Sequence, residues 1–202
     1  MPDSDVGDHR PRLTLITGEP GSGKSTLGTE LSRALSIPFL ARDDIRRGLY
    51  FTAGAWTDHP GPVPSAEASV ETFLRVIESM TALGVSLVAE YVVRRDRSAE
   101  LDRLRNAADC AVIVTKSSAA PQRFRTRHVR DRLINRRPVL DALGYASAEE
   151  HTVDAVERMR SVTEEMRTDF DLPTLVVDTD GEYSPGLDDI IGFVTGASGL
   201  RR

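Results

Sequence analysis

A glycine-rich segment near the start of the chain, "GEPGSGKST" at 18–26, has the residue types of a phosphate-binding loop. Its spacing fits G-x-x-x-x-G-K-[ST], with Lys24 and Ser25 at the last two positions. Glycines let backbone N–H groups approach phosphate oxygens, the lysine adds a cation, and the serine hydroxyl can hold Mg²⁺. The motif therefore predicts binding of a nucleoside triphosphate, ATP or GTP, together with Mg²⁺. The predicted nucleotide-binding residues of the loop are Gly18, Glu19, Pro20, Gly21, Ser22, Gly23, Lys24, Ser25 and Thr26.

A second segment whose residue types could take part in catalysis is "RDDIRRGLY" at 42–50, in which Asp43 and Asp44 precede Arg46. A carboxylate close to a transferred phosphoryl group can orient a hydroxyl acceptor and take its proton. Acids at the start of a helix also cap and charge its first turn, which is favourable by about 0.3–1 kcal/mol. Both roles can apply to different members of the pair, so one of the two acids is predicted to be a general base.

The third candidate is an arginine-rich stretch at 121–137, within a region at about 118–145. On a helix Arg123, Arg127, Arg130 and Arg137 share one face, because they are three, four or seven residues apart. Such a face could close over the site as a lid and neutralise the charge that develops on a γ-phosphoryl group. Two alternatives stay open, a solvated helix in an arginine-rich chain and a basic groove for a polynucleotide backbone.

The elements that must position these residues are short apolar strands alternating with helices. Strands are predicted at 13–17, 37–41, 85–93, 110–115 and 173–179, and helices at about 24–36, 45–51, 65–83, 96–107, 120–137, 147–170 and 186–197. The pattern predicts an α/β fold with a five-stranded parallel sheet, helices on both faces and an arginine-rich helical lid. One domain is expected over 12–202, after a flexible tail at 1–11. The two acids follow the second strand, which is expected beside the strand that carries the phosphate loop.

Composition narrows the class of protein further. The 202-residue chain has a net charge of −5, which disfavours a dedicated nucleic-acid-binding protein. One cysteine, Cys110, excludes an intramolecular disulfide, and the four histidines lack the spacing of zinc ligands. Neither a secretory leader nor an apolar run of about 18 residues is visible, so no membrane partner and a cytoplasmic location are expected.

The string "RDDIRRGLY", which follows a strand some twenty residues after the phosphate loop, resembles a branch of small P-loop phosphotransferases. This branch includes chloramphenicol phosphotransferase, the zeta toxins and the kinase domain of polynucleotide kinases. The resemblance implies a P-loop NTPase fold with Asp43 as the general base, Arg46 as an acceptor contact and Asp44 as a helix-capping or secondary residue. It also implies that lid arginines, Arg123 and Arg127 first, contact the phosphates. The loop after the last strand would border the adenine, which places Asp178 and Thr179 near it; the alternative is an ordinary turn into the last helix, with Pro185 near its start.

Further acceptor-side candidates are Glu90, Tyr50 and Trp56. Glu90 lies in "AEYVVRRD", the region at the end of the third strand where a hydrolase commonly carries a Mg²⁺-binding acid, so Glu90 or Asp43 could join Ser25 at a metal. The two aromatic side chains could stack on an aromatic or sugar acceptor, or they could anchor their loop to the core.

These residues together predict an ATP-dependent phosphotransferase that moves the γ-phosphoryl group to a hydroxyl of a small molecule. An antibiotic or other natural product, a nucleoside and a nucleotide sugar are the acceptor classes considered. A polynucleotide 5′-hydroxyl kinase is the first alternative, although "EYV" at 90–92 replaces the Asp-Thr-Asn-type signature of that group. The second alternative is a regulatory or toxin-like nucleotide-binding module with weak ATPase activity. The "DTDG" at 178–181 matches a GTPase pattern, but no N-K-x-D follows it, so the match is regarded as accidental.

Overall fold

A parallel five-stranded sheet in the order β2-β3-β1-β4-β5 forms the centre of the computed structural model, which describes residues 10–59, 61–62, 64–131 and 135–196. Its strands are β1 Arg12–Gly18, β2 Phe39–Ala41, β3 Leu87–Glu90, β4 Asp109–Lys116 and β5 Thr174–Asp178. The predicted fold class is confirmed, and β3 is shorter than expected. One expectation was wrong: β2 does not lie beside β1, because β3 pairs with both and separates them.

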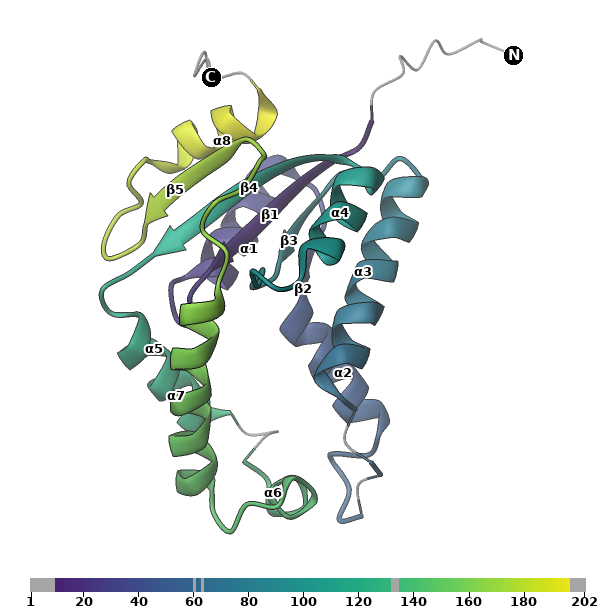
Figure 1. Cartoon of the computed structure of the whole chain (residues 1–202), viewed down its shortest axis with the longest axis vertical. Helices are drawn as coiled ribbons and strands as arrows, with labels where there is room; N and C mark the ends of the chain where they lie inside the picture. Colours follow the sequence, from purple (N-terminus) through teal and green to yellow (C-terminus); the bar gives the residue numbers. More distant parts are fainter. Residues whose placement is uncertain (1–9, 60, 63, 132–134, 197–202) are drawn as a thin grey trace.

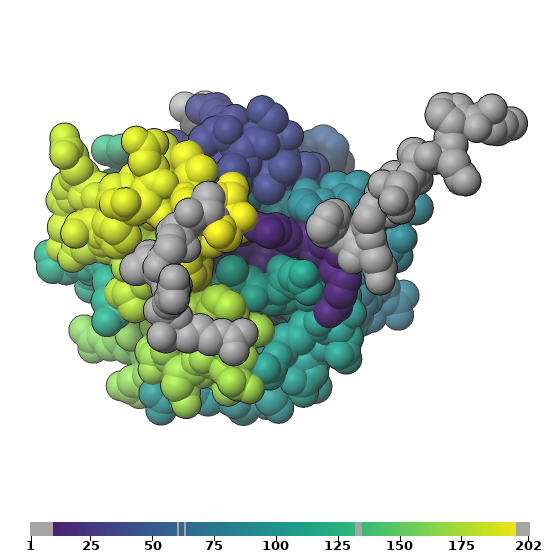
Figure 2. All heavy atoms as spheres, turned by 90° about the horizontal axis from the view of Figure 1, so that it is seen from above, coloured from purple at the N-terminus to yellow at the C-terminus, as the bar shows by residue number. Residues whose placement is uncertain are grey.

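Helices cover both faces of this sheet, because each buried strand has an apolar side chain on either face. Leu13 and Leu15 of β1 pack with Phe73 and Leu104 on the face covered by α3 and α4. Ile16, the residue after Leu15, points to the opposite face, where α1 and α8 supply the apolar partners. Figure 1 shows this layering, and in the view from above in Figure 2 the dark purple start of β1 emerges between yellow α8 and the teal and blue segments.

The helices lie close to their predicted positions. They are α1 Lys24–Leu35, α2 Arg42–Thr52, α3 Ala66–Ala82, α4 Ser98–Ala107, α5 Ala120–Arg130, α6 Arg137–Leu143, α7 Ala148–Glu165 and α8 Leu187–Thr195. Ser65 and Ser147 cap α3 and α7 through their side chains, as the sequence indicates. None of the helices in the described ranges is both long and apolar enough to cross a bilayer.

Some helix boundaries differ from the prediction. The helix expected near Ile45 begins at Arg42, so both acids of the pair lie in the first turn of α2. The arginine-rich stretch is not one helix, because α5 ends at Arg130 and Arg137 begins α6. α7 ends at Glu165 rather than near 170. Residues 1–9 of the predicted tail at 1–11 lie outside the described residues. Arg10, which is described, forms an ion pair with Asp109 at an N–O distance of 3.5 Å.

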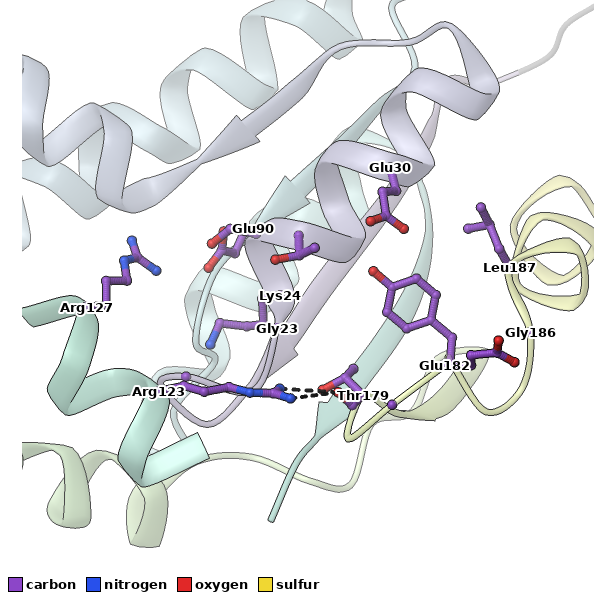
Figure 3. Close-up of a pocket in the computed structure, with 15 residues that line it drawn as sticks. Gly23, Lys24, Glu30, Glu90, Arg123, Arg127, Thr179, Glu182, Gly186 and Leu187 are labelled. Atoms are coloured by element: carbon purple, nitrogen blue, oxygen red, sulfur yellow. Dashed lines mark hydrogen bonds between the residues drawn. The ribbon is translucent and has the colours of Figure 1, made fainter. Parts of the chain in front are cut away.

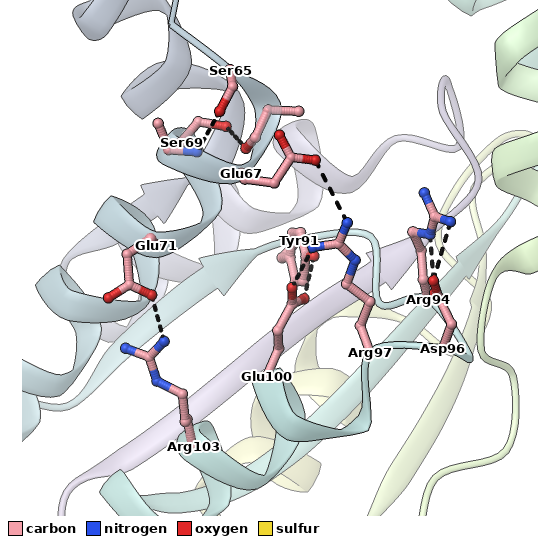
Figure 4. A network of polar contacts seen from close by, with 12 residues as sticks. Ser65, Glu67, Ser69, Glu71, Tyr91, Arg94, Asp96, Arg97, Glu100 and Arg103 are labelled. Carbon is pink, nitrogen blue, oxygen red and sulfur yellow. Dashed lines mark hydrogen bonds and ion pairs between the residues drawn. The ribbon is translucent and has the colours of Figure 1, made fainter.

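Ion pairs connect α3 and α4 beside the end of β3. Arg103 of α4 reaches Glu71 and Glu78 of α3, with N–O distances of 2.7 Å to each. Arg97 contacts Glu100 at 3.1 Å, and Glu100 also accepts the hydroxyl proton of Tyr91, which follows β3 directly (Figure 4). This network holds the residue after Glu90 in place, so the carboxyl end of β3 is anchored to the helical layer.

Candidate active site

The phosphate loop connects β1 to α1 at the carboxyl edge of the sheet. α1 begins at Lys24, one residue after Gly23, whose left-handed backbone (φ 86°) turns the chain into the helix. The Lys24 Nζ atom donates to the carbonyl oxygens of Gly18 at 3.0 Å and Glu19 at 2.8 Å. Burial lowers the pKa of Lys24, although the carboxylates of Glu90 and Asp43 act in the opposite direction. The lysine is thus folded back over its own loop, beside a helix N-terminus suited to phosphate.

Gly21 is the point at which the phosphate loop touches the lid. Its φ is +89°, and a Cβ atom placed there would lie 2.1 Å from the carbonyl oxygen of Ala120. Because Ala120 is the first residue of α5, no larger side chain fits at position 21 unless the lid helix moves.

A cleft of about 820 Å³ opens over the loop, a size suited to a nucleotide (Figure 3). It is formed by the phosphate loop and α1, by the ends of β3 and β5, by α5, and by the loop before α8. The lining residues are Gly21, Gly23, Lys24, Ser25, Thr26, Glu30, Glu90, Arg123, Arg127, Thr179, Gly181, Glu182, Tyr183, Gly186 and Leu187. The structure therefore brings the predicted phosphate loop, two predicted lid arginines and Glu90 to one cavity.

Asp43 lies beside this cleft, between the arginines of α2 and α5. One carboxylate oxygen is 3.4 Å from Arg42 and the other is 3.9 Å from Arg127. Burial acts to raise the pKa of Asp43, but the positive charges of Arg42, Arg127 and Lys24 outweigh it and the pKa is lowered. The side chain is 48% exposed, so the charged carboxylate remains open to a ligand.

Asp44 differs from Asp43 in its surroundings. Its carboxylate points to Arg47 at 3.6 Å, one turn along α2, and is 67% exposed. Of the two roles expected for Asp44, helix capping was wrong, because Ala41 occupies the N-cap and no side chain caps it; Asp44 does lie in the first turn of α2. The two adjacent acids therefore face different groups.

Glu90 ends β3 and faces the cleft from within the protein. Its side chain is buried, and its Oε2 atom has no hydrogen-bond partner among the residues that the structure describes. Burial raises the pKa of Glu90, whereas Lys24 and the Ser25 hydroxyl favour its charged form. A buried carboxylate oxygen without a partner, close to a hydroxyl at a phosphate site, is a donor set that fits a hard cation such as Mg²⁺.

The lid arginines occupy different positions on α5. Arg123 donates through both terminal nitrogens to the carbonyl oxygen of Thr179, at 3.2 Å each, on the β5 side of the cleft (Figure 3). Arg127, one turn later, lies on the Asp43 side. Arg130 is not a lining residue of the cleft, and Arg137 pairs with Asp141 within α6 at 2.7 Å. The predicted single arginine face is therefore divided between two helices.

The predicted acceptor contacts on and after α2 are engaged with one another. Arg46 donates to the Tyr50 hydroxyl at 3.1 and 2.7 Å, and the tyrosine ring is buried with Ala55 and Val139. Trp56 is half-exposed and stacks under the guanidinium of Arg136 at 5.5 Å, outside the cleft lining. Tyr50 and Trp56 thus anchor the segment after α2 to α6, which was one of the two interpretations of their role.

The loop after β5 contributes more residues than the sequence indicated. Thr179 lines the cleft and donates its hydroxyl to the Ser22 carbonyl at 2.9 Å, whereas Asp178 is not a lining residue and accepts the Asp180 N–H at 2.8 Å. The residues missed by sequence reasoning are Glu30, Gly181, Glu182, Tyr183, Gly186 and Leu187. Glu30 follows Thr26 by one turn of α1, so helical spacing could have identified it.

Comparison with known proteins finds the same fold in several solved kinases. The sequence matches no family model and no curated protein. In structure it is similar to a protein assigned as a kinase in Chloroflexus aurantiacus, with a TM-score of 0.64, 22% identity, and coverage of 93% of this chain and 98% of that chain. It is also similar to a shikimate kinase from Acinetobacter baumannii, with a TM-score of 0.51, 17% identity, and coverage of 95% and 96%. A gluconokinase from Sinorhizobium meliloti gives a TM-score of 0.51 at 16% identity, with coverage of 93% and 92%. At these identities the likeness defines the fold.

Proposed function

We propose that the protein is an ATP-dependent phosphotransferase that transfers the γ-phosphoryl group to a hydroxyl of a small molecule. The observation that carries the proposal is the position of Asp43, whose charged carboxylate faces Arg127 beside a cleft lined by Lys24 and the phosphate loop. This arrangement offers a donor site in the cleft and, beside it, a group for orienting a hydroxyl. The fold shared with solved kinases is consistent with it.

In the proposed reaction the triphosphate lies along the phosphate loop, with the nucleoside between α1 and the loop after β5. Asp43 accepts a hydrogen bond from the acceptor hydroxyl, aligns its oxygen with the γ-phosphorus and receives its proton as the O–P bond forms. Because the transition state is loose, the proton moves late, and a carboxylate of lowered pKa can serve by orientation. Lys24 and Arg127 offset the negative charge on the transferred group and on the departing ADP.

Ser25 and Glu90 are the residues that would hold Mg²⁺, which supplies charge neutralisation to the β- and γ-phosphates when bound. The partner-free Oε2 atom of Glu90 supports this role, since it leaves one buried oxygen available. ATP is the proposed donor, with GTP as the alternative.

The decisive experiment measures ADP formation with purified protein, ATP and Mg²⁺ against a panel of hydroxyl compounds. The panel contains sugars, nucleosides, nucleotide sugars, aminoglycoside and phenicol antibiotics, and a 5′-hydroxyl oligonucleotide. Acceptor-dependent ADP with a matching phosphorylated product supports the proposal. ADP release at the same rate without any acceptor identifies an ATPase instead. Turnover of the oligonucleotide alone, with an affinity that falls steeply with salt, identifies a polynucleotide kinase.

A further inference from the structure

The loop after β5 holds the start of the lid helix through the side chain of Asp180. Its Oδ1 atom accepts the Ser117 hydroxyl proton at 2.5 Å, and its Oδ2 atom accepts the N–H of Ser118 at 2.8 Å. The N–H of Ala119 lies 3.4 Å from Oδ1. Hydrogen bonds from Ser117 and Ser118 lower the pKa of Asp180, so it is charged at neutral pH. Asp180 therefore binds every residue of the connection between β4 and α5.

The preceding residue, Thr179, makes the other contacts that join this loop to the site. Its carbonyl oxygen accepts both terminal nitrogens of Arg123, and its hydroxyl donates to the carbonyl of Ser22 in the phosphate loop. Two consecutive residues thus contact the phosphate loop, a lid arginine and the base of the lid helix.

The orientation of Asp180 is fixed locally by a tight turn. The Asp178 carboxylate accepts the Asp180 N–H at 2.8 Å, and the Asp178 backbone pairs with Ser184 across the turn. This turn gives the "DTDG" segment a structural role that does not depend on its match to a GTPase motif. Its acids direct one carboxylate toward the start of α5, while the flanking Thr179 and Gly181 line the cleft.

We propose that Asp180 is a positioning residue that couples occupancy of the nucleoside side of the cleft to the placement of Arg127 on the lid. A ligand that contacts Thr179, Gly181 or Tyr183 orders the loop after β5. The Asp180 side chain of this loop fixes the N-terminal end of α5. Arg127 lies on that helix, two turns from its start, so a small rotation at the origin displaces its guanidinium from the transferred group. The inference rests on the proposed function, because the position of Arg127 affects turnover only where a phosphoryl group is transferred.

The test is a double-mutant cycle between Asp180→Ala and Arg127→Ala, read out as kcat and KM for ATP and as the affinity for a non-hydrolysable ATP analogue. Loss of the charge-assisted contacts is expected to lower kcat/KM about tenfold in Asp180→Ala. Asp180→Asn is expected to retain part of the activity, because its amide oxygen can still accept the Ser118 N–H. The double variant is expected to lose little beyond Arg127→Ala alone, since the two residues act through one position. Asp188→Asn, which removes the same charge from an exposed site in the first turn of α8, is the matched control.

The outcomes separate the two proposals. Independent losses that multiply in the double variant, or full activity in Asp180→Ala, overturn the coupling. If Asp180→Ala only destabilises the fold, the active fraction of the protein falls, and this loss multiplies with the loss caused by Arg127→Ala. That result would also overturn the coupling. Wild-type protein without acceptor-dependent ADP formation overturns the proposed function, while the same cycle measured in analogue binding still decides whether Asp180 and Arg127 are coupled.

Discussion

The Nη2 atom of Arg127 on α5 lies 3.9 Å from the Oδ2 atom of Asp43 on α2, so the lid helix and α2 approach each other beside the cleft. At half exposure for both side chains, such a contact contributes about 0–1 kcal/mol to stability. Its significance is geometric. A phosphoryl group passing between the donor and a hydroxyl held by Asp43 would lie next to the arginine that offsets its charge.

Asp43→Asn is expected to lower kcat by about 10²- to 10⁴-fold, because the amide cannot take a proton from the acceptor. Nucleotide affinity should change little, since the phosphate loop is untouched. Asp44→Asn is the matched control, because Asp44 faces Arg47 and is largely exposed. Steady-state kinetics with titration of an ATP analogue distinguish the two; equal losses in both variants would contradict the assignment of Asp43.

Arg127→Ala is expected to lower kcat by about 10²-fold, the usual loss when one donor to a developing charge is removed. Arg130→Ala serves as the control, because Arg130 lies on the same helix without lining the cleft. The measurement is kcat at saturating ATP and acceptor. A full kcat in Arg127→Ala would remove this residue from the proposed charge-neutralising role.

Lys24→Ala is expected to reduce turnover by at least about 10²-fold, because the cation nearest the β- and γ-phosphates is lost. The chain has one other lysine, Lys116, whose side chain is exposed at the end of β4. Lys116→Ala removes the same functional group from a site outside the cleft and should keep wild-type rates. Nucleotide turnover that survives in Lys24→Ala would refute the phosphate-loop assignment.

Stability is expected to fall below about pH 6.5 because of His151 on α7. This side chain is 5% exposed, and its ring centroid lies 4.7 Å from that of His128 and 4.5 Å from that of Tyr145. Burial, with the nearby His128 and Arg158, lowers the pKa of His151 to about 4. The unfolded chain therefore binds a proton more readily than the folded chain, so the free energy of unfolding decreases as pH drops from 6.5 towards 4.

Chemical denaturation at a series of pH values tests this effect. His151→Phe keeps the aromatic contacts and should lose about 1–2 kcal/mol less than the wild type over that interval, a figure reduced for partial solvent screening. His59→Gln changes an exposed loop histidine and should leave the wild-type profile unaltered. A His151→Phe curve parallel to the wild type would show that the acid sensitivity arises from other groups.

Local signals were sufficient to predict much of the fold. Apolar runs bounded by glycine, together with the capping serines Ser65 and Ser147, defined the strands and most helix starts. Strand order was not available from such signals, since it depends on which crossover packs on which face. The sequence therefore placed β2 beside β1, whereas β3 lies between them and delivers Glu90 to the cleft.

The phosphate loop could be identified from the sequence, because phosphate binding by such a loop depends on a backbone geometry that few residue types permit. The wall of the cleft formed by the loop after β5 could not be predicted, since Tyr183 and Glu182 are residue types common on any surface and line the cleft only once the chain has folded. Asp44 illustrates the same limit. An acid at a helix start has several partners available, and only the positions of Arg47 and Ala41 decide among them.

The close approach of Gly21 to the first residue of the lid helix has a consequence for recognising other chains of this kind. A Cβ atom at position 21 would meet backbone atoms of Ala120 and Phe124, so glycine should be retained at position 21 whatever residue begins the helix. A glycine at this position would mark chains in which the lid helix rests directly on the phosphate loop. It could be sought in sequences whose overall identity is too low to show kinship.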